Sequence, residues 1–281
     1  MTIKELYNFI CKEFENAKIE DYKCEIEYIF EKYFGLTKSG MIIKFDDIVS
    51  EQAKIDLLKI LDKRKDGIPL QYILGIWEFM GLEFNVGSGV LVPRDDTTVL
   101  VQESYKYVSK LKNPKIIDLC SGTGCIAIAL DKNLKNSPEI YGVEKSKKAF
   151  KYLSKNVEFH KSKIECINAD IFEIYSNFRD DFFDIIISNP PYIKSCDIRT
   201  LQKEVKKEPL MALDGGKDGL YFYRKISDLW TSKLKSGGMI AFEIGIGQSS
   251  QVSEILINHN FKNIQVIKDI NSIDRVVTGI K

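Results

Sequence analysis

The feature that most constrains the fold is the alternation of short apolar runs with helical stretches from Lys115 to the end of the chain. The expected strands are Ile116–Leu119, Ile140–Val143, Ile164–Ile167, Phe183–Ser188, Met239–Ile244, Ile264–Ile267 and Arg275–Gly279. Repeated strand–helix units predict an α/β fold in which helices cover both faces of a mostly parallel sheet. The last two runs are joined only by Asp269–Asp274, which is too short for a crossover connection. The final strand is therefore expected to run antiparallel.

The first 75 residues carry a different period. Apolar residues at helical spacing predict a helix from Ile3 to Phe14. Thr2 and Glu5 form a capping-box pattern at its start. A second helix is expected over 22–34, before Gly35. A third is expected over 51–65, with Ile55, Leu58 and Leu61 on one face and cations at its carboxyl end. The segment predicts a small helical bundle.

Between these two regions the period changes to two. Alternating apolar residues from Trp77 to Val86, broken at Gly81, predict a β-hairpin. The sequence thus divides into a helical domain over 1–75, a hairpin linker over 76–96 and an α/β domain over 97–281.

Composition excludes several classes of protein. The formal net charge of +1 disfavours extensive phosphate contacts, so nucleic acid binding is not expected. The six cysteines include no Cys-x-x-Cys pair and there are two histidines, which argues against a metal site. Scattered thiols favour a reducing, cytoplasmic location. No apolar run is long enough to span a bilayer, so no membrane association is expected.

The corner Ser188–Tyr192 ends the most apolar expected strand. The two prolines cannot donate backbone hydrogen bonds, and Pro191 holds Pro190 in an extended conformation, which leaves the Pro190 carbonyl free. That carbonyl and the side-chain oxygen of Asn189 can accept both hydrogens of one planar NH2 group, against which Tyr192 can stack. A plain strand-ending turn is the alternative, because Asn-Pro is common in turns.

A glycine turn follows the first strand of the α/β domain, within Ile117–Ala127. Gly122 and Gly124 allow the backbone to approach a ligand closely, and the free N–H groups of the next helix point into the crevice. Glu144, which ends the next strand, is placed to accept hydrogen bonds from ribose hydroxyls. Asp170 ends the third strand–helix unit and can meet an adenine amine.

The turn alone fits either a nicotinamide dinucleotide or S-adenosylmethionine. Asp118 precedes it and can hold an ammonium group, which the methionine half of S-adenosylmethionine carries. The acceptor pair at Asn189 also lies where the amino group of a methyl acceptor is expected. Both observations favour S-adenosylmethionine.

Both motifs resemble those of class I S-adenosylmethionine-dependent methyltransferases that modify amino groups, including adenine-N6 and glutamine-N5 enzymes. Further segments narrow the resemblance to the release factor glutamine methyltransferase family. They are Gly67–Gly75, Val92–Thr97, Glu208–Leu220, Glu243–Gln248 and Asp274–Val277. The sequence departs from the family pattern at Cys120, where a glycine is frequent, at Asp95 and Thr98 beside Arg94, and at Asn271 or Ser272.

The resemblance implies the class I fold, a seven-stranded, mostly parallel sheet with an antiparallel last strand. It also implies methyl transfer to the glutamine of the Gly-Gly-Gln motif of peptide chain release factors, with S-adenosylhomocysteine as the second product. The implied catalytic residues are Asn189, Pro190 and Tyr192. The implied cofactor-binding residues are Asp118, Cys120, Ser121, Gly122, Thr123, Gly124, Glu144, Asp170, Ile171 and Asn189. The implied substrate-binding residues are Asn189, Pro190, Pro191, Tyr192 and Arg94. Residues 1–75 would then recognise the release factor.

Three other functions remain compatible with the residues alone. An adenine-N6 methyltransferase would use the same acceptor pair, but it predicts a basic face or a large recognition domain. A ribosomal-protein glutamine is a second possible substrate. A non-enzymatic binding protein would have no need for two aligned acceptors.

Overall fold

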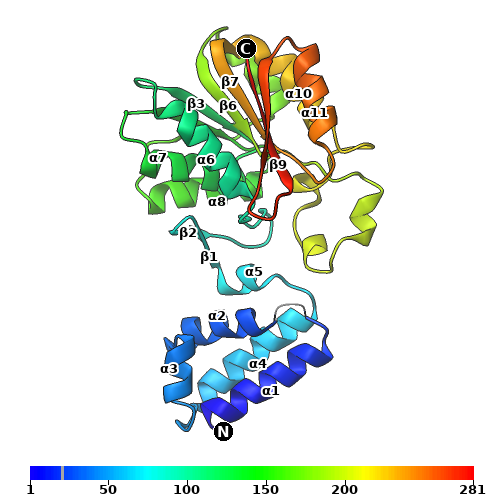
Figure 1. Cartoon of the computed structure of the whole chain (residues 1–281). Coiled ribbons are helices and arrows are strands. Elements are labelled where there is room, and N and C mark those ends of the chain that lie inside the picture. Colours follow the sequence, from blue (N-terminus) through cyan, green and yellow to red (C-terminus); the bar gives the residue numbers. More distant parts are fainter. Residues whose placement is uncertain (20–21) are drawn as a thin grey trace. The chain divides into compact units, whose positions relative to one another are not determined.

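The computed structural model describes residues 1–19 and 22–281 (Figure 1). These residues form two compact units. One contains Met1–Gly75 together with Lys203–Lys207, and the other contains Ile76–Gln202 together with Glu208–Lys281. The segment Lys203–Lys207, which lies in the chain after Asn189, therefore belongs to the helical unit.

The helical unit consists of α1 (Ile3–Asn16), α2 (Tyr22–Phe34), α3 (Lys38–Ile43), α4 (Glu51–Lys65) and α5 (Leu70–Leu74). The capping box is present, since the Thr2 hydroxyl accepts from the Glu5 amide and the Glu5 carboxylate accepts from the Thr2 amide. The short helices α3 and α5 were not predicted, because neither is long enough to show a helical period.

The predicted core face of α4 is confirmed at Leu61 and in part at Leu58, which packs partly buried against the core, but it was wrong at Ile55. Leu57, Ile60 and Leu61 are buried, whereas Ile55 is 41% exposed. The buried stripe continues at Arg64, which has 1% exposure and was taken for a cation at the helix end. Because one buried position of this face is an arginine, the spacing of apolar residues alone does not reveal the face.

Ion pairs compensate the burial of Arg64. Its guanidinium donates two hydrogen bonds of 2.7 Å to the Glu25 carboxylate, one of 2.6 Å to Glu204 and one of 2.6 Å to the Ile68 carbonyl. Such forked pairing offsets the large cost of removing a charge from water. Glu204 comes from the segment Lys203–Lys207, so this arginine fixes that segment within the helical unit.

The second unit begins with the predicted hairpin, formed by β1 (Ile76–Phe79) and β2 (Leu82–Asn85). Its turn residues Met80 and Gly81 have φ angles of 52° and 74°. Two left-handed residues match the twist of the flanking strands.

The large sheet has seven strands in the order β5-β4-β3-β6-β7-β9-β8. They are β3 (Lys115–Leu119), β4 (Glu139–Val143), β5 (Glu165–Ile167), β6 (Phe183–Ser188), β7 (Leu234–Glu243), β8 (Lys262–Lys268) and β9 (Asp274–Ile280). The first four pairings from β5 to β7 are parallel, and β9 runs antiparallel to both β7 and β8. The predicted sheet and its antiparallel last strand are confirmed. Strand β7 begins five residues before the expected Met239, because Leu234 already pairs with Phe183 ahead of a bulge.

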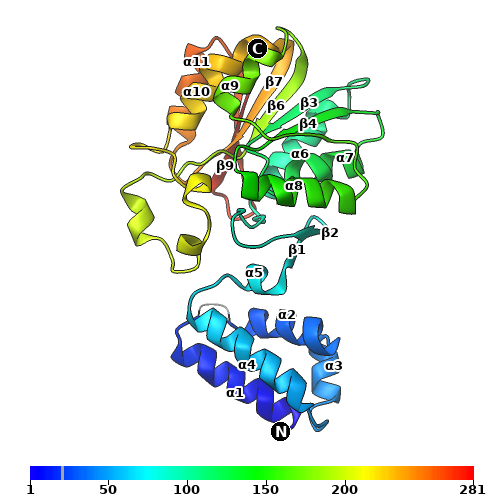
Figure 2. The same ribbon diagram turned by 180° about the vertical axis from the view of Figure 1, so that it is seen from behind.

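Helices cover both faces of this sheet (Figures 1 and 2). On one face lie α6 (Thr97–Val108), α7 (Cys125–Asn133) and α8 (Lys147–Phe159), and on the other lie α9 (Ile171–Ile174), α10 (Tyr221–Trp230) and α11 (Ser249–Asn258). Each face has its own apolar core. Short 3₁₀ helices cover Tyr175–Asn177, Asp197–Thr200, Val205–Lys207, Leu210–Ala212 and Thr231–Lys233. Within the described residues, no helix is long and apolar enough to cross a membrane.

Candidate active site

The glycine turn and the Asn-Pro-Pro-Tyr corner leave the sheet side by side. Strands β3 and β6 are neighbours, and Leu119 is paired with Ser188 at the end of both. The Ser188 hydroxyl donates to the Leu119 carbonyl at 2.7 Å. Because the strands are parallel, the loops that follow them meet at the same edge of the sheet.

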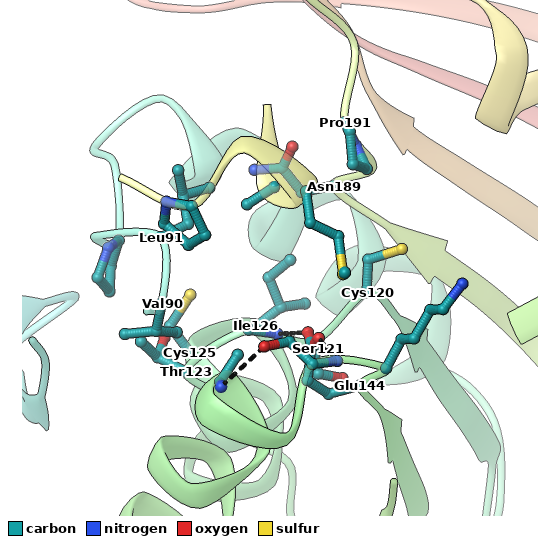
Figure 3. A pocket seen from close by; sticks show the side chains of 18 of the residues that line it. Val90, Leu91, Cys120, Ser121, Thr123, Cys125, Ile126, Glu144, Asn189 and Pro191 are labelled. Atoms are coloured by element: carbon teal, nitrogen blue, oxygen red, sulfur yellow. Dashed lines mark hydrogen bonds between the residues drawn. The ribbon is translucent and has the colours of Figure 1, made fainter. Parts of the chain in front are cut away.

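One cavity lies at this edge, and both loops line it (Figure 3). Its wall is formed by residues 89–94 and Thr97, by 120–123, 125 and 126, by 144–146 and Ala149, by 170–172, by Asn189 and Pro191, and by Pro209, Met211, Ala212 and Phe222. All of these residues belong to the second unit.

The glycine turn needs left-handed backbone at three positions. Cys120, Gly122 and Gly124 have φ angles of 65°, 56° and 81°. A Cβ at Gly124 would lie 2.6 Å from Leu153 Cδ1, whereas at Gly122 the nearest atom would be Val90 Cγ2 at 3.9 Å. Position 124 therefore requires glycine, because a side chain there would clash with Leu153. Gly122 lies on the cavity wall beside Val90, where a Cβ would meet no close atom. Cys120 adopts a conformation that is strained for a residue with a side chain, which is consistent with the expectation that glycine is frequent at this position.

Glu144 is held at the end of β4 by backbone amides. Its Oε2 accepts from Gly122 N at 3.0 Å and its Oε1 from Ser146 N at 2.7 Å. Burial raises the pKa of this carboxyl, and the two amides partly offset the effect. Each oxygen keeps a free lone pair, so the carboxylate can still accept from hydroxyl groups in the cavity.

Asp118 is fully buried on β3 and is not part of the cavity wall. Burial raises the pKa of its carboxyl to about 7; the Ser121 side chain opposes the shift and the Glu144 charge adds to it. Neither carboxylate oxygen has a hydrogen bond of acceptable geometry from any residue that the structure describes. A buried acceptor without a partner is costly, so it suits a site that a donor completes.

Asp170 lies on the wall at the start of α9. Its Oδ1 accepts from Phe172 N at 3.0 Å, which caps the helix. Its Oδ2 forms an ion pair of 2.6 Å with Lys145, which also lines the cavity. The neighbouring Ile171 and Phe172 add an apolar surface to the wall.

The side chain of Asn189 lines the cavity and has a defined partner. Its Nδ2 donates to the Thr97 hydroxyl at 3.3 Å. Among the described residues, no donor reaches the Asn189 Oδ1 or the Pro190 carbonyl. Neither acceptor of the predicted pair therefore has a donor within the described residues, but only Asn189 lies on the cavity wall.

The other residues of the corner are placed differently. Pro191 lines the cavity, whereas Pro190 and Tyr192 are not part of its wall. The Tyr192 hydroxyl donates to Glu243 at 3.4 Å, and burial raises its pKa. The stacking role expected of Tyr192 stays a prediction.

Arg94 forms an ion pair with Glu208, whose side chain is 2% exposed. Glu208 precedes Pro209, Met211 and Ala212, which all line the cavity. Arg94 therefore holds this segment at the wall, a role that sequence reasoning did not assign.

Sequence reasoning also missed the roles of Thr97 and Gln248. The Gln248 amide donates to the carbonyls of Tyr192 at 2.9 Å and Gly219 at 3.3 Å, and its oxygen accepts from Gly245 N at 2.9 Å. It thus fixes the backbone of the corner. Both residues lie in segments that carry the family resemblance. No local sequence pattern, however, shows that a threonine at a helix start or a glutamine in a loop bonds to a distant segment.

The fold and the cavity define the class of protein. A seven-stranded sheet with an antiparallel last strand, and a glycine turn beside an acid at the end of the next strand, are those of an S-adenosylmethionine-dependent methyltransferase. Residues 95–214 match the methyltransferase small domain, and residues 5–75 match the PrmC N-terminal domain.

The full-length relatives are more specific. The chain is 42% identical over 259 residues to the release factor glutamine methyltransferase of Thermodesulfovibrio yellowstonii, with 90% of each chain covered. It is 37% identical over 272 residues to that of Clostridium botulinum, with 95% of each covered. The chain belongs to the release factor glutamine methyltransferase family.

Solved structures show the same fold at low sequence identity. The hMettl16 catalytic domain in complex with MAT2A 3'UTR hairpin 1 aligns with a TM-score of 0.59 and 13% identity, over 94% of this chain and 92% of that chain. A methyltransferase from Pyrococcus furiosus aligns with a TM-score of 0.53 and 16% identity, over 83% and 99%. At such identities the likeness concerns the fold alone.

Proposed function

We propose that this protein transfers a methyl group from S-adenosylmethionine to the side-chain amide nitrogen, N5, of the glutamine in the Gly-Gly-Gln motif of peptide chain release factors. The observation that carries the proposal is the placement of Asn189 and Gly122 on the wall of one cavity. An acceptor for an NH2 group thereby lies beside the turn that approaches the cofactor. Family membership supports the substrate, because the full-length relatives carry that name.

An amide nitrogen is a weak nucleophile because its lone pair is delocalised into the carbonyl. Asn189 Oδ1 and the Pro190 carbonyl each accept one N–H of the glutamine NH2, which fixes the nitrogen and turns its lone pair toward the methyl donor. The positive charge that develops on nitrogen is stabilised by the same two oxygens. The nitrogen then loses one proton to water or a nearby acceptor, so a histidine base is not required.

The residues of the cavity fit S-adenosylmethionine. Glu144 would accept from the ribose hydroxyls and Asp170 from the adenine amine. Asp118 is buried and does not line the cavity, so its carboxylate would attract the ammonium through its charge. Cys120, Ser121, Gly122 and Thr123 would form the floor below the methionine half, and Ile171 would contact the adenine. Gly124 would contribute as the last residue of the turn, packed against Leu153 and not on the cavity wall. When bound, the cofactor supplies an electrophilic methyl group and leaves as S-adenosylhomocysteine.

The domains have separate roles in this proposal. Residues 1–75 recognise the body of the release factor, 76–96 connect, and 97–281 carry the chemistry. Pro191, Tyr192 and Arg94 border the entering glutamine, with Arg94 acting through the wall segment that it holds. The six cysteines are free thiols, which supports a cytoplasmic location.

The test offers the purified protein methyl-labelled S-adenosylmethionine with release factor, a ribosomal protein or DNA. We expect label on the release factor alone, a mass gain of one methyl, and no label when the glutamine of its Gly-Gly-Gln motif is replaced by alanine. Label on DNA would favour the adenine-N6 alternative. Label on the ribosomal protein would redirect the substrate, and no label on any acceptor would contradict the proposal.

A further inference from the structure

The Asn-Pro-Pro-Tyr corner can work only if its acceptors keep a fixed position. One end of the corner is held by the sheet, because Ser188 is the last residue of β6 and is paired with Leu119 and Phe242. The two prolines that follow have locked φ angles, so the corner bends little between Ser188 and Tyr192. The position of the Pro190 carbonyl therefore depends on what holds Tyr192.

Gln248 holds Tyr192 from outside the cavity. Its side-chain nitrogen donates to the carbonyls of Tyr192 at 2.9 Å and Gly219 at 3.3 Å, and its oxygen accepts from the Gly245 amide at 2.9 Å. A carbonyl only accepts and a backbone N–H only donates, so these partners allow one orientation of the Gln248 amide. The side chain is 7% exposed and is not part of the cavity wall, so it does not contact the proposed substrate or cofactor.

The three bonds tie two loops to the sheet. Gly245 follows β7, and the residue between them donates its amide proton to β9. Gly219 and Tyr192 lie in the loops before α10 and after β6. The backbone bonds of Ile193 join these two loops to each other. The Tyr192 hydroxyl also reaches β7, but at the longer distance of 3.4 Å, so Gln248 makes the shorter tie.

Close packing leaves this junction little room to move. A Cβ at Gly219 would lie 2.4 Å from the Tyr192 carbonyl oxygen, and a Cβ at Gly215 would lie 2.7 Å from Tyr192 Cα. A Cβ at Gly245 would lie 3.0 Å from both Gln248 Oε1 and Tyr192 Cδ2. Three segments thus approach Tyr192 and Gln248 more closely than a residue with a side chain would allow.

We propose that Gln248 is a positioning residue for methyl transfer. It fixes the Tyr192 carbonyl to the end of β7, and the two locked prolines carry that position to the acceptors of Asn189 and Pro190. The inference rests on the proposed function, since it concerns the corner that grips the glutamine. Without this tie the NH2 group would lie off the line of methyl transfer, and a displacement of about 1 Å can slow such a reaction about a hundredfold.

The test replaces Gln248 by methionine, which keeps the length of the side chain and removes both ends of the amide. We expect kcat for release factor to fall at least about tenfold, while the Kd for S-adenosylmethionine by calorimetry stays within about threefold of wild type.

Asn136→Leu is the matched control, because the Asn136 amide also donates to two backbone carbonyls, those of Val108 and Leu111, both at 2.8 Å. Asn136 precedes β4, at the edge of the sheet opposite the cavity. This variant should lose stability and keep its kcat.

Gln248→Glu tests the bond to Tyr192 more narrowly. The variant keeps the shape but turns a carboxylate oxygen toward the Tyr192 carbonyl, so it should also be slow. A protonated carboxyl would again supply a hydrogen to that carbonyl. The kcat of this variant relative to wild type should therefore rise as pH falls from about 8 to about 6, the range in which a buried carboxyl without a cation titrates.

Three results would overturn the inference. One is a wild-type kcat in Gln248→Met, and another is an equal loss of kcat in Asn136→Leu, which would mean that lost stability explains the effect. The third is a raised Kd for S-adenosylmethionine that accounts for the whole loss. If Gln248→Met does not fold by circular dichroism, Gln248→Glu decides, and a kcat ratio that is constant with pH would reject the inference. A wild-type protein that labels no release factor would refute the proposed function itself, so the two failures are distinguishable.

Discussion

The backbone amide of Gly122 donates to the Glu144 carboxylate at 3.0 Å, so the glycine turn of β3 is tied directly to the acid that ends β4. The two motifs of the cofactor site thus form one structure without any ligand. Since Glu144 both shapes the turn and is proposed to accept from the ribose, it has two effects on binding.

Replacing Glu144 by alanine is therefore expected to weaken S-adenosylmethionine binding by at least about tenfold, which corresponds to about 1.4 kcal/mol. Calorimetric titration measures the Kd directly. The control is Glu158→Ala, an exposed carboxylate on α8 that should leave the Kd unchanged. Equal affinity of the Glu144 variant and the wild type would remove this residue from the site.

Asp118 predicts a dependence of stability on pH in the cofactor-free protein. Its folded pKa of about 7 lies above the ordinary 3.8, so between these values the unfolded state binds fewer protons than the folded state. The free energy of unfolding therefore falls as pH rises toward 7, by up to about 1.4 kcal/mol per pH unit for one group, and this loss is complete above 7.

Asp118→Asn removes this contribution. Urea unfolding at pH 5 and pH 7 should show the stability of the variant relative to wild type increasing by about 2 kcal/mol at the higher pH. Replacement of the exposed Asp197 by asparagine serves as the control and should show no such change. A constant difference between wild type and Asp118→Asn would mean that the Asp118 carboxyl titrates normally.

The sequence predicted the sheet well because its signals are local. Apolar runs such as Phe183–Ser188 are short and bounded by breakers, and the short connection after β8 determined the direction of β9. The positions of Asn189 and Gly122 followed from the parallel order, since both end strands at one edge.

The sequence could not predict contacts that are made by buried polar side chains. Arg64 completes the buried face of α4, although an arginine near a helix end usually indicates a solvated terminus. Thr97 and Gln248 act through side-chain hydrogen bonds to residues more than 50 positions away. Their partners are known only once the chain is folded.

The ion pair of Arg94 with Glu208 is expected to hold the segment that carries Pro209 and Met211 at the cavity wall. Arg94→Ala removes the guanidinium from a buried carboxylate, so the free energy of unfolding should fall by about 2 kcal/mol and the Kd for S-adenosylmethionine should rise. Chemical denaturation and calorimetry measure the two effects.

Arg224→Ala is the matched control, because the Arg224–Asp218 pair is exposed at 45% and 49%. An exposed pair contributes less than about 1 kcal/mol. If the two variants were equally stable and bound the cofactor equally well, Arg94 would not be holding the wall.

Arg64 tests the proposed role of the helical unit. Arg64→Leu leaves Glu25 and Glu204 without their common cation, which should destabilise this unit by about 3 to 5 kcal/mol. Methylation of intact release factor should then fall through a raised KM, while cofactor binding should stay near wild type. Circular dichroism follows the loss of helix, and Lys59→Ala, in an exposed pair, is the control. An unchanged KM for release factor after the helical unit melts would argue against recognition by residues 1–75.

The central claim is that Asn189 holds the glutamine amide beside the methyl donor, and a single-turnover rate of methyl transfer tests it most directly. Asn189→Ala, saturated with labelled S-adenosylmethionine and mixed with excess release factor, should transfer its methyl at least about a hundredfold more slowly than wild type. The Kd for the cofactor should remain within about threefold. A variant that binds the cofactor normally and transfers the methyl at a near wild-type rate would contradict the account.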